Sequence, residues 1–284
     1  MSILCPGYIG MASVGGKQIR CTDFSINPNQ QLLFYDHIIG LNDTVPVGSE
    51  TKGEEVGTIQ PQKRIARPSP ISIGGGFSFP AASRSSDNNF EDLFDHAKYG
   101  TYFDMGFQYH RGSGKTSRRF INCRVNQFTF SINASDILNI SVDVFAKDMT
   151  DTGQVSSYNT SEKLVTWDKV EVSTGSVSSN KGIYGIEFTI NNNLQNIYTN
   201  DSYDSFLPTD IRIGMQEVRG SLSVYDIPQQ DFLDSSTAPS KIEITTPGFT
   251  TEINVVFIPQ QISAVMGPII TQVPFVGVGK AFGE

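Results

Sequence analysis

The segment that comes closest to a known chemical site is Gly112-Ser113-Gly114-Lys115-Thr116. It resembles the end of a phosphate-binding loop, in which glycine backbone N–H groups and a lysine hold phosphate at the start of a helix. That loop also requires a glycine five residues before Gly114, and this position is Tyr109. The residues that follow have the pattern of a strand. We therefore expect a basic hairpin tip, with Arg111, Lys115, Arg118 and Arg119, that could dock on an acidic partner or on another copy of the chain.

The residue types that bind metals or catalyse reactions are scattered along the chain. His37, His96 and His110 have no metal-ligand spacing, and the three cysteines have no CxxC spacing and cannot all pair within one chain. The adjacent acids at 54–55 and 91–92 fall in an expected loop and at an expected helix start. Glycosidase chemistry stays an unsupported alternative, because two carboxylates distant in sequence can meet in space. We expect no catalytic residue, no cofactor and no metal.

Composition predicts a β-rich globular protein. The 284 residues include 26 Gly, 14 Pro, 19 Phe and 10 Tyr, which suit many short strands joined by turns. The start of the sequence lacks the pattern of a signal peptide, and no run is long and apolar enough for a membrane helix. We therefore expect a product of the cytoplasm with no membrane contact.

The net charge of −8 is unevenly distributed. Residues 1–151 carry 14 basic and 15 acidic side chains, whereas residues 152–284 carry 7 and 14. Proteins that grip nucleic acid do so mainly by neutralising phosphates with Lys and Arg. This balance argues against such a grip, but it is compatible with a surface past which DNA must move.

The candidate functional residues lie on two predicted hairpins. A phrase of the form Phe-(Ser/Thr)-Ile-Asn occurs at residues 24–27, 130–133 and 188–191. The second copy opens a hairpin over Phe128 to Phe145, and the third opens one over Ile186 to Tyr225. The copy at residue 24 lacks such a partner strand in this interpretation.

In both hairpins alternate positions are apolar, which predicts one buried and one exposed face. The expected buried positions are Phe128, Phe130, Ile132, Leu138, Ile140, Val142, Val144, Ile186, Phe188, Ile190, Val218, Leu222 and Val224. The opposite positions carry mostly short polar or acidic side chains: Thr129, Ser131, Asn139, Ser141, Asp143, Glu187, Thr189, Ser221 and Ser223. Arg219 lies on the same side and departs from this pattern. Aromatic platforms for sugars or single-stranded nucleic acid are missing from this set. By itself the pattern also fits the ordinary solvent face of a sandwich.

Other elements are expected around these hairpins. Tyr8–Val14 and Lys17–Asn27 should pair through a turn at Gly15-Gly16, and Ile71–Pro80 should be a strand with a bulge or a close backbone approach at its three glycines. A helix should begin near Phe90, capped by Asp87 or Asn89, and end at Gly100. A bulge is expected near Gln216, and a short helix at Pro228–Leu233. Further strands are expected at Gln31–Ile39, Thr101–His110, Ser117–Asn133, Leu164–Val172, Ile183–Asn191, Ile211–Tyr225, Lys241–Thr245, Thr250–Ile258 and Ile269–Val278.

Residues 40–70 should form a long loop without strands. The loop holds Glu50, Glu54 and Glu55, followed by Lys63, Arg64 and Arg67. A solvated flexible loop and an arm that orders against a neighbouring subunit are both open. Because no proline-rich linker divides the chain, we expect residues 1–284 to form a single composite β domain.

The order and phrasing of several segments are similar to the tail tube proteins of tailed bacteriophages. These segments are GYIGMASVGGKQIRCTDFSIN, CRVNQFTFSINASDILNISVDVFAKD, GIYGIEFTINNNLQ, IRIGMQEVRGSLSVYD and PIITQVPFVGVGK. The resemblance implies a mainly β protein, an antiparallel β-sandwich or barrel with one short flanking helix. It implies that two long hairpins of each subunit form an inner-barrel sheet in a ring oligomer.

By this resemblance the chain is a structural, non-enzymatic subunit whose rings, commonly hexameric in the family, stack into a tube that conducts DNA from capsid to host. The nine short polar residues would face the lumen, and genomic DNA would pass without specific binding. The implied location is the virion tail, assembled in the bacterial cytoplasm. The other implied partners are tail proteins such as sheath, tape measure or baseplate. The arm and the basic hairpin tip would contact neighbours through Glu50, Glu54, Glu55, Lys63, Arg64, Arg67, Arg111 and Lys115.

Two alternatives remain at this level. One is another ring-forming component of a phage or secretion system, such as a baseplate-proximal tube initiator, which would form single rings. The other is a β-sandwich carbohydrate-binding module, disfavoured by the lone Trp167. The sequence does not distinguish contractile from non-contractile tails, or six single units from three duplicated ones.

Overall fold

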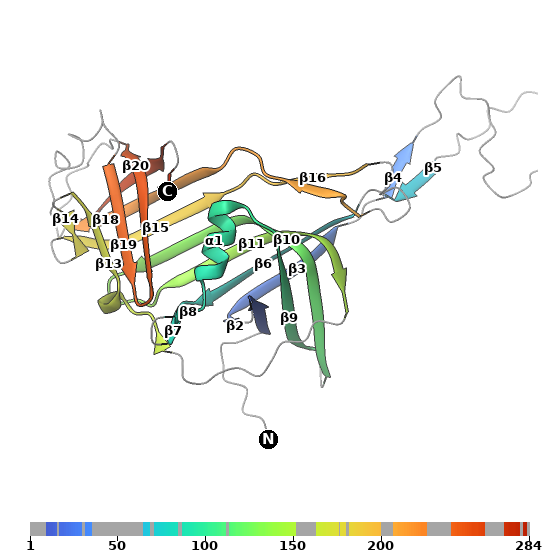
Figure 1. Ribbon diagram of the computed structural model, residues 1–284, viewed down its shortest axis with the longest axis horizontal. Helices are drawn as coiled ribbons and strands as arrows, with labels where there is room; N and C mark the ends of the chain where they lie inside the picture. Colours follow the sequence, from blue (N-terminus) through green and yellow to red (C-terminus); the bar gives the residue numbers. More distant parts are fainter. Residues whose placement is uncertain are drawn as a thin grey trace, which may run out of the picture.

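The computed structural model describes residues 10–15, 17–29, 32–35, 65–68, 71–84, 87–111, 114–151, 163–175, 177–179, 182–199, 207–225, 240–258, 270–278 and 281–282. For residues 26–29, 32–35, 65–68, 84, 87, 109–111, 114–116 and 270 it describes the backbone alone. Antiparallel strands dominate, with a helix on the inner face of a strongly bent sheet (Figure 1).

Most strands belong to one 14-stranded sheet. Its order is β14 (Val177–Ser178), β13 (Glu171–Thr174), β19 (Ser240–Thr246), β20 (Phe249–Phe257), β21 (Ile270–Gly277), β18 (Glu217–Tyr225), β15 (Ile183–Asn191), β10 (Gly114–Asn133), β11 (Asn139–Thr150), β6 (Ser72–Pro80) and β3 (Asp23–Asn29). A branch is formed by β9 (Phe103–Arg111), which pairs with β10 and with β1 (Gly10–Val14), and β1 pairs with β2 (Lys17–Cys21). We call strands β3, β6, β11, β10, β15, β18 and β21 the central sheet.

Three smaller sheets complete the described fold. They comprise β12 (Lys163–Leu164) with β7 (Ala82–Arg84) and β8 (Asp87–Asn88), β16 (Gln195–Ile197) with β17 (Asp210–Arg212), and β4 (Leu32–Tyr35) with β5 (Ile65–Pro68). The helix α1 covers Glu91–Tyr99, and a single 3₁₀ turn covers Trp167–Lys169.

The core lies between the central sheet and the parts of the larger sheet that fold over it. On one side α1 separates β10 from β20: the Phe94 ring meets Phe128 of β10 at 5.6 Å and Phe249 of β20 at 4.9 Å, edge to face. Phe90 bridges the same two strands through Phe130 and Phe249. Such aromatic pairs stabilise the core beyond the burial of their area, and they fix the distance between the two layers.

The other side of the core is closed by β9 and β1. Phe107 of β9 meets Phe77 of β6 at 5.4 Å and Phe120 of β10 at 5.4 Å. Ile19 of β2 and Ala12 of β1 are fully buried. Within the described residues, these elements cover one face of the central sheet, as in a sandwich.

Many of the sequence predictions are confirmed. The predicted first hairpin is present, with Val14 of β1 opposite Lys17 of β2. The helix buries Leu93, Phe94 and Ala97 and ends at Gly100, whose φ of 61° is left-handed. The strand at Ile183–Asn191 has the predicted limits, and the strands near residues 103, 241, 250 and 270 differ by only a few residues.

Of the two alternatives predicted for the glycines of β6, the close backbone approach is confirmed, whereas the predicted side-chain cap of α1 is wrong. β6 pairs without a bulge on both sides, so its glycines serve the close backbone approach instead. The N-cap residue of α1 is Phe90, and the side-chain oxygen of Asn88 accepts hydrogen bonds from the backbone N–H groups of Phe90 and Glu91. Asn89 instead uses its side chain to hold Ala82 N and Pro80 O.

The predicted strand from Ile211 to Tyr225 is interrupted, and the reason lies at the end of α1. Gln216 Nε2 donates to the carbonyl oxygens of Ala97 and Lys98, two of the last carbonyls of the helix. Asn192, fully buried, donates to Ala97 O and accepts from Gln216. Residues between β17 and β18 make these contacts outside any strand, so β17 and β18 are separate strands in different sheets. This interruption takes the place of the predicted bulge.

Three further strand predictions need correction. Residues 164–172 contain a 3₁₀ turn between two short strands, where Thr166 bonds to the Asp168 side chain and so competes with strand pairing. The predicted strand Lys17–Asn27 breaks at Thr22, whose backbone N and side chain both donate to Ser78 O. The phrase at residue 24 does have a partner, because β3 pairs with β6 with Phe24 opposite Phe77.

The predicted loop 40–70 contains a strand at its end. β5 pairs with β4, with Leu32 opposite Pro68, and this hairpin projects from the body at the right of Figure 1. The predicted strand Gln31–Ile39 is described only as β4, and the predicted helix at 228–233 lies outside the described residues.

Candidate functional site

The two predicted hairpins lie side by side in the middle of the central sheet. β10 pairs with both β11 and β15, and β15 pairs with β18, so the order is β11, β10, β15, β18. All thirteen positions expected to be buried are at most 3% exposed. All nine short polar residues lie on the opposite face, which we call the polar face, and none of them is buried.

Strand register brings the nine residues together in rows. Thr129 is opposite Ser141 on one side and Thr189 on the other, and its hydroxyl lies 3.0 Å from that of Thr189. Ser131 is opposite Asn139 and Glu187 in the next row. The hydroxyls therefore satisfy one another across strands, and the surface stays polar without long side chains.

The polar face continues beyond the two hairpins. Ser78 of β6 is opposite Ser141 and donates to its hydroxyl at 3.1 Å. On the other side Pro274 of β21 is opposite Ser221. The outer strands of both hairpins are thus already paired within the chain.

Charge on the polar face is mainly acidic. Arg219 lies on this face and pairs with Glu217 of the same strand at 3.0 Å, which neutralises it locally. Asp143 and Glu187 are exposed, with no basic partner among the described contacts. A mildly negative field repels other negative charges at short range.

Asp143 owes its position to a glycine of the neighbouring strand. It is opposite Gly76 of β6, and a Cβ atom on residue 76 would overlap the Asp143 carboxylate. The Asp143 side chain is exposed to solvent on one side and lies against the β6 backbone on the other. This partial burial raises the pKa of Asp143 above the usual 3.8. Gly76 therefore leaves room for the Asp143 side chain.

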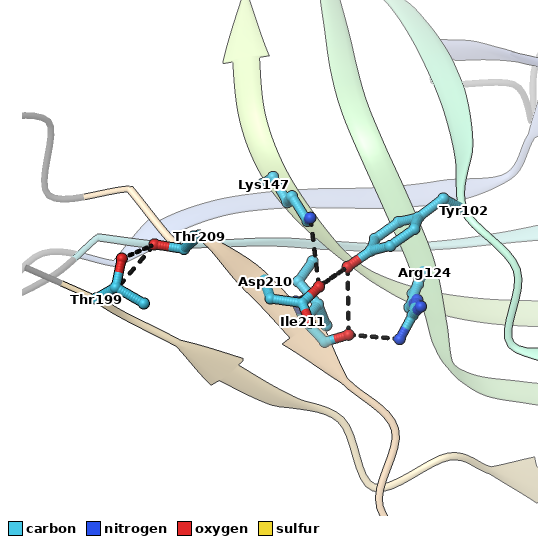
Figure 2. A network of polar contacts seen from close by, with 7 residues as sticks. All are labelled: Tyr102, Arg124, Lys147, Thr199, Thr209, Asp210 and Ile211. Atoms are coloured by element: carbon cyan, nitrogen blue, oxygen red, sulfur yellow. Dashed lines mark hydrogen bonds and ion pairs between the residues drawn. The ribbon is translucent and has the colours of Figure 1, made fainter. Parts of the chain in front are cut away.

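One end of the polar face is covered by a cluster of charged residues around a tyrosine (Figure 2). The Tyr102 ring lies between the Arg124 guanidinium at 4.0 Å and the Lys147 ammonium at 4.5 Å. Its hydroxyl donates to Asp210 of β17, and Lys147 lies 3.3 Å from the same carboxylate. These hydrogen bonds lower the pKa of Asp210. We call Tyr102, Arg124, Lys147 and Asp210 the clamp.

The clamp holds two of the cations that the sequence places near the polar face. Arg124 also donates to the backbone oxygen of Ile211, and Ile211 N donates to the Tyr102 hydroxyl at 3.1 Å. Both cations are occupied by protein groups, so neither projects from the polar face as a free charge. Sequence analysis missed this cluster, because its members are distant in sequence and have no characteristic spacing.

The side chains of the residues predicted to contact neighbouring copies lie outside the part of the chain that the structure describes. Glu50, Glu54, Glu55, Lys63 and Arg64 lie outside the described residues. Arg67, Arg111 and Lys115 lie in β5, β9 and β10, where the backbone alone is described. Their roles stay predictions.

Within the described part of the chain, no group of three or more His, Cys, Asp or Glu could hold a metal ion. The thiols of Cys21 and Cys123 are buried, which raises the pKa of Cys21 to about 12 and that of Cys123 further. None of the described helices has the length and apolar character needed to cross a membrane.

The sequence matches the family of phage tail tube proteins over residues 49–277. A search among curated proteins finds no match. The family match spans both hairpins, the helix and most of the central sheet, so the chain belongs to the phage tail tube family. Its role is structural, in a virion tail where it assembles with other tail subunits.

Proposed function

We propose that this chain assembles as one composite domain into stacked rings, hexameric as the family resemblance implies, and that its polar face lines the bore through which genomic DNA passes. The observation that carries the proposal is the uniform chemistry of that face. Thr129, Thr189 and Ser141 form its centre, and its exposed Arg219 is paired with Glu217. Short side chains keep a bore open, and a mildly negative surface does not hold phosphates.

Ring closure must use strands outside the two hairpins. Since β11 pairs with β6 and β18 with β21, neither hairpin offers an unpaired outer edge over these registers. Adjacent copies would therefore join through other parts of the chain, among which are the predicted contact residues of the arm and the basic hairpin tip. Sheath, tape measure or baseplate proteins would be further partners, and assembly would take place in the host cytoplasm.

Charge reversal on the polar face tests the proposed bore. Changing both Asp143→Lys and Glu187→Lys should leave assembly intact, because both side chains are exposed. The two lysines of every copy would attract the DNA backbone, so infectivity of phage carrying the variant should fall by at least about tenfold.

The matched control is Glu171→Lys with Glu243→Lys. These exposed acids lie on β13 and β19, in the layer on the other side of the core. The control should retain infectivity. If phage carrying the polar-face variant assemble as many tails as unmodified phage and are equally infectious, the proposed lining is contradicted.

A further inference from the structure

The β4–β5 hairpin needs support from the rest of the chain if it is to point in one direction. It continues the β3–β6 pair: Asn29 is opposite Ser72 at the end of that pair, and Leu32 is opposite Pro68 at the start of the next. An isolated two-stranded hairpin is marginally stable in water. Its direction is therefore set where it joins the central sheet, at residues 71 and 72 on the β6 side.

Strand β16 contacts this junction directly. Asn196 Nδ2 donates to the Ser72 hydroxyl at 3.0 Å, and the hydroxyl of Tyr198, just after β16, donates to the backbone oxygen of Ile71 at 3.0 Å. Both side chains are partly buried, and partial burial raises the pKa of Tyr198. In Figure 1 β16 runs from the body toward β4 and β5.

Strand β16 is held in turn by β17 and the clamp. Asn196 is opposite Ile211, and Ile197 is opposite Asp210. Beyond the paired residues the hydroxyls of Thr199 and Thr209 meet at 2.9 Å. Asp210 and Ile211 are the two residues that Tyr102 contacts, and Lys147 and Arg124 bind them from β11 and β10 (Figure 2).

A continuous series of contacts therefore links the polar-face strands to the junction. It runs from β10 and β11 through the clamp to β17, then to β16, and ends at Ile71 and Ser72. The β16–β17 pair has only three residues in each strand. So short a sheet depends for its stability on contacts with the rest of the chain. The charge-assisted hydrogen bonds of the clamp are stronger than hydrogen bonds between neutral groups.

We propose that β16 and β17 act as a brace that fixes the direction of the β4–β5 hairpin, and that this direction is required for one copy of the chain to engage the next. The second half of this proposal rests on the assembly proposed above. The first half concerns the isolated chain. Tyr102, Asn196 and Tyr198 are its positioning residues.

Distance measurements between spin labels test the first half. One label goes on Ala66→Cys in β5 and one on Asn139→Cys in β11, in a Cys5→Ser background. Cys21 and Cys123 are buried and poorly ionised, and so react slowly. The Tyr102→Phe and Tyr198→Phe variants each remove one hydroxyl and keep the ring. Each should broaden the distance distribution, while Tyr184→Phe, an exposed tyrosine of β15, should not.

Assembly measured by sedimentation tests the second half. The concentration needed for assembly should rise about tenfold in Tyr102→Phe, the loss expected for one charge-assisted hydrogen bond that supports the contact. Circular dichroism and the melting temperature show whether Tyr102→Phe has folded. If it has not, the assembly of Tyr198→Phe provides the test.

The outcomes separate the brace from the proposed function. An unchanged distance distribution in both variants overturns the brace, whether or not assembly is impaired. If the distribution of label distances broadens but assembly is unchanged, the second half of the proposal is wrong, because a fixed direction of the β4–β5 hairpin is then not required for assembly. Failure of the unmodified chain to assemble under any condition counts against the proposed tube, while the distance measurement still tests the brace.

Discussion

Asn192 is the residue at which the helix, the central sheet and the break between β17 and β18 meet. Its buried amide donates to Ala97 O at the end of α1 and to Val125 O in β10, and it accepts from Gln216. A buried amide with all these partners fixes one arrangement of the neighbouring elements. Sequence reasoning did not find it, because an Asn after a strand is usually explained by a turn.

Replacing this amide should be costly. Asn192→Ala leaves the oxygens of Ala97 and Val125 without this donor, so the free energy of unfolding should fall by about 2–4 kcal/mol. Chemical denaturation would measure it. The exposed Asn139→Ala on the polar face is the control and should change stability by less than about 0.5 kcal/mol. Equal, small effects would show that the Asn192 contacts contribute little.

At the scale of elements, neighbouring glycines of β6 differ in the space around them. It lies between β3 and β11, and Gly75 faces the core side. A Cβ atom there would lie 2.9 Å from Ser25 O and 3.0 Å from a ring carbon of Phe120. Gly74, on the other face, has room, since its Cβ would be 3.5 Å from Val144 O.

Adjacent substitutions in β6 should therefore differ sharply. Gly75→Ala should lower the free energy of unfolding by about 1–3 kcal/mol, because both close neighbours must move. Gly74→Ala should be neutral within about 0.5 kcal/mol or slightly stabilising, because alanine restricts the unfolded chain. Thermal unfolding of the two variants side by side provides the measurement. The reverse order would contradict the packing of β3 against β6.

The alternation of residue types predicted individual elements better than their connections. In the hairpins from Phe128 and Ile186, side chains alternate between core and solvent, so the two faces could be assigned from sequence. The break at residues 213–216 could not, because it depends on the distant end of α1. The clamp was missed for the same reason. The nine candidate residues form one surface, but which environment that surface meets in a tail is still a prediction.

At the scale of the whole molecule, one face of a seven-stranded sheet is apolar and covered, and the other is short, polar and mildly acidic. The helix and the folded-over strands β20 and β9 occupy the apolar side. In a ring, that thick side would lie outward and the polar face inward. The arrangement suits a tube subunit, because the polar face, whose nine short residues are not buried in the described structure, is the one that would contact a passing polymer.

Electron cryo-microscopy of assemblies formed by the purified chain tests this account most directly. We predict stacked rings with Thr129, Thr189 and Ser141 on the wall of a continuous bore, wider than the DNA duplex of roughly 20 Å. The β4–β5 hairpin should point toward an adjacent copy. A map that places these residues on the outer surface or between subunits, or a chain that stays monomeric at high concentration, would contradict the account.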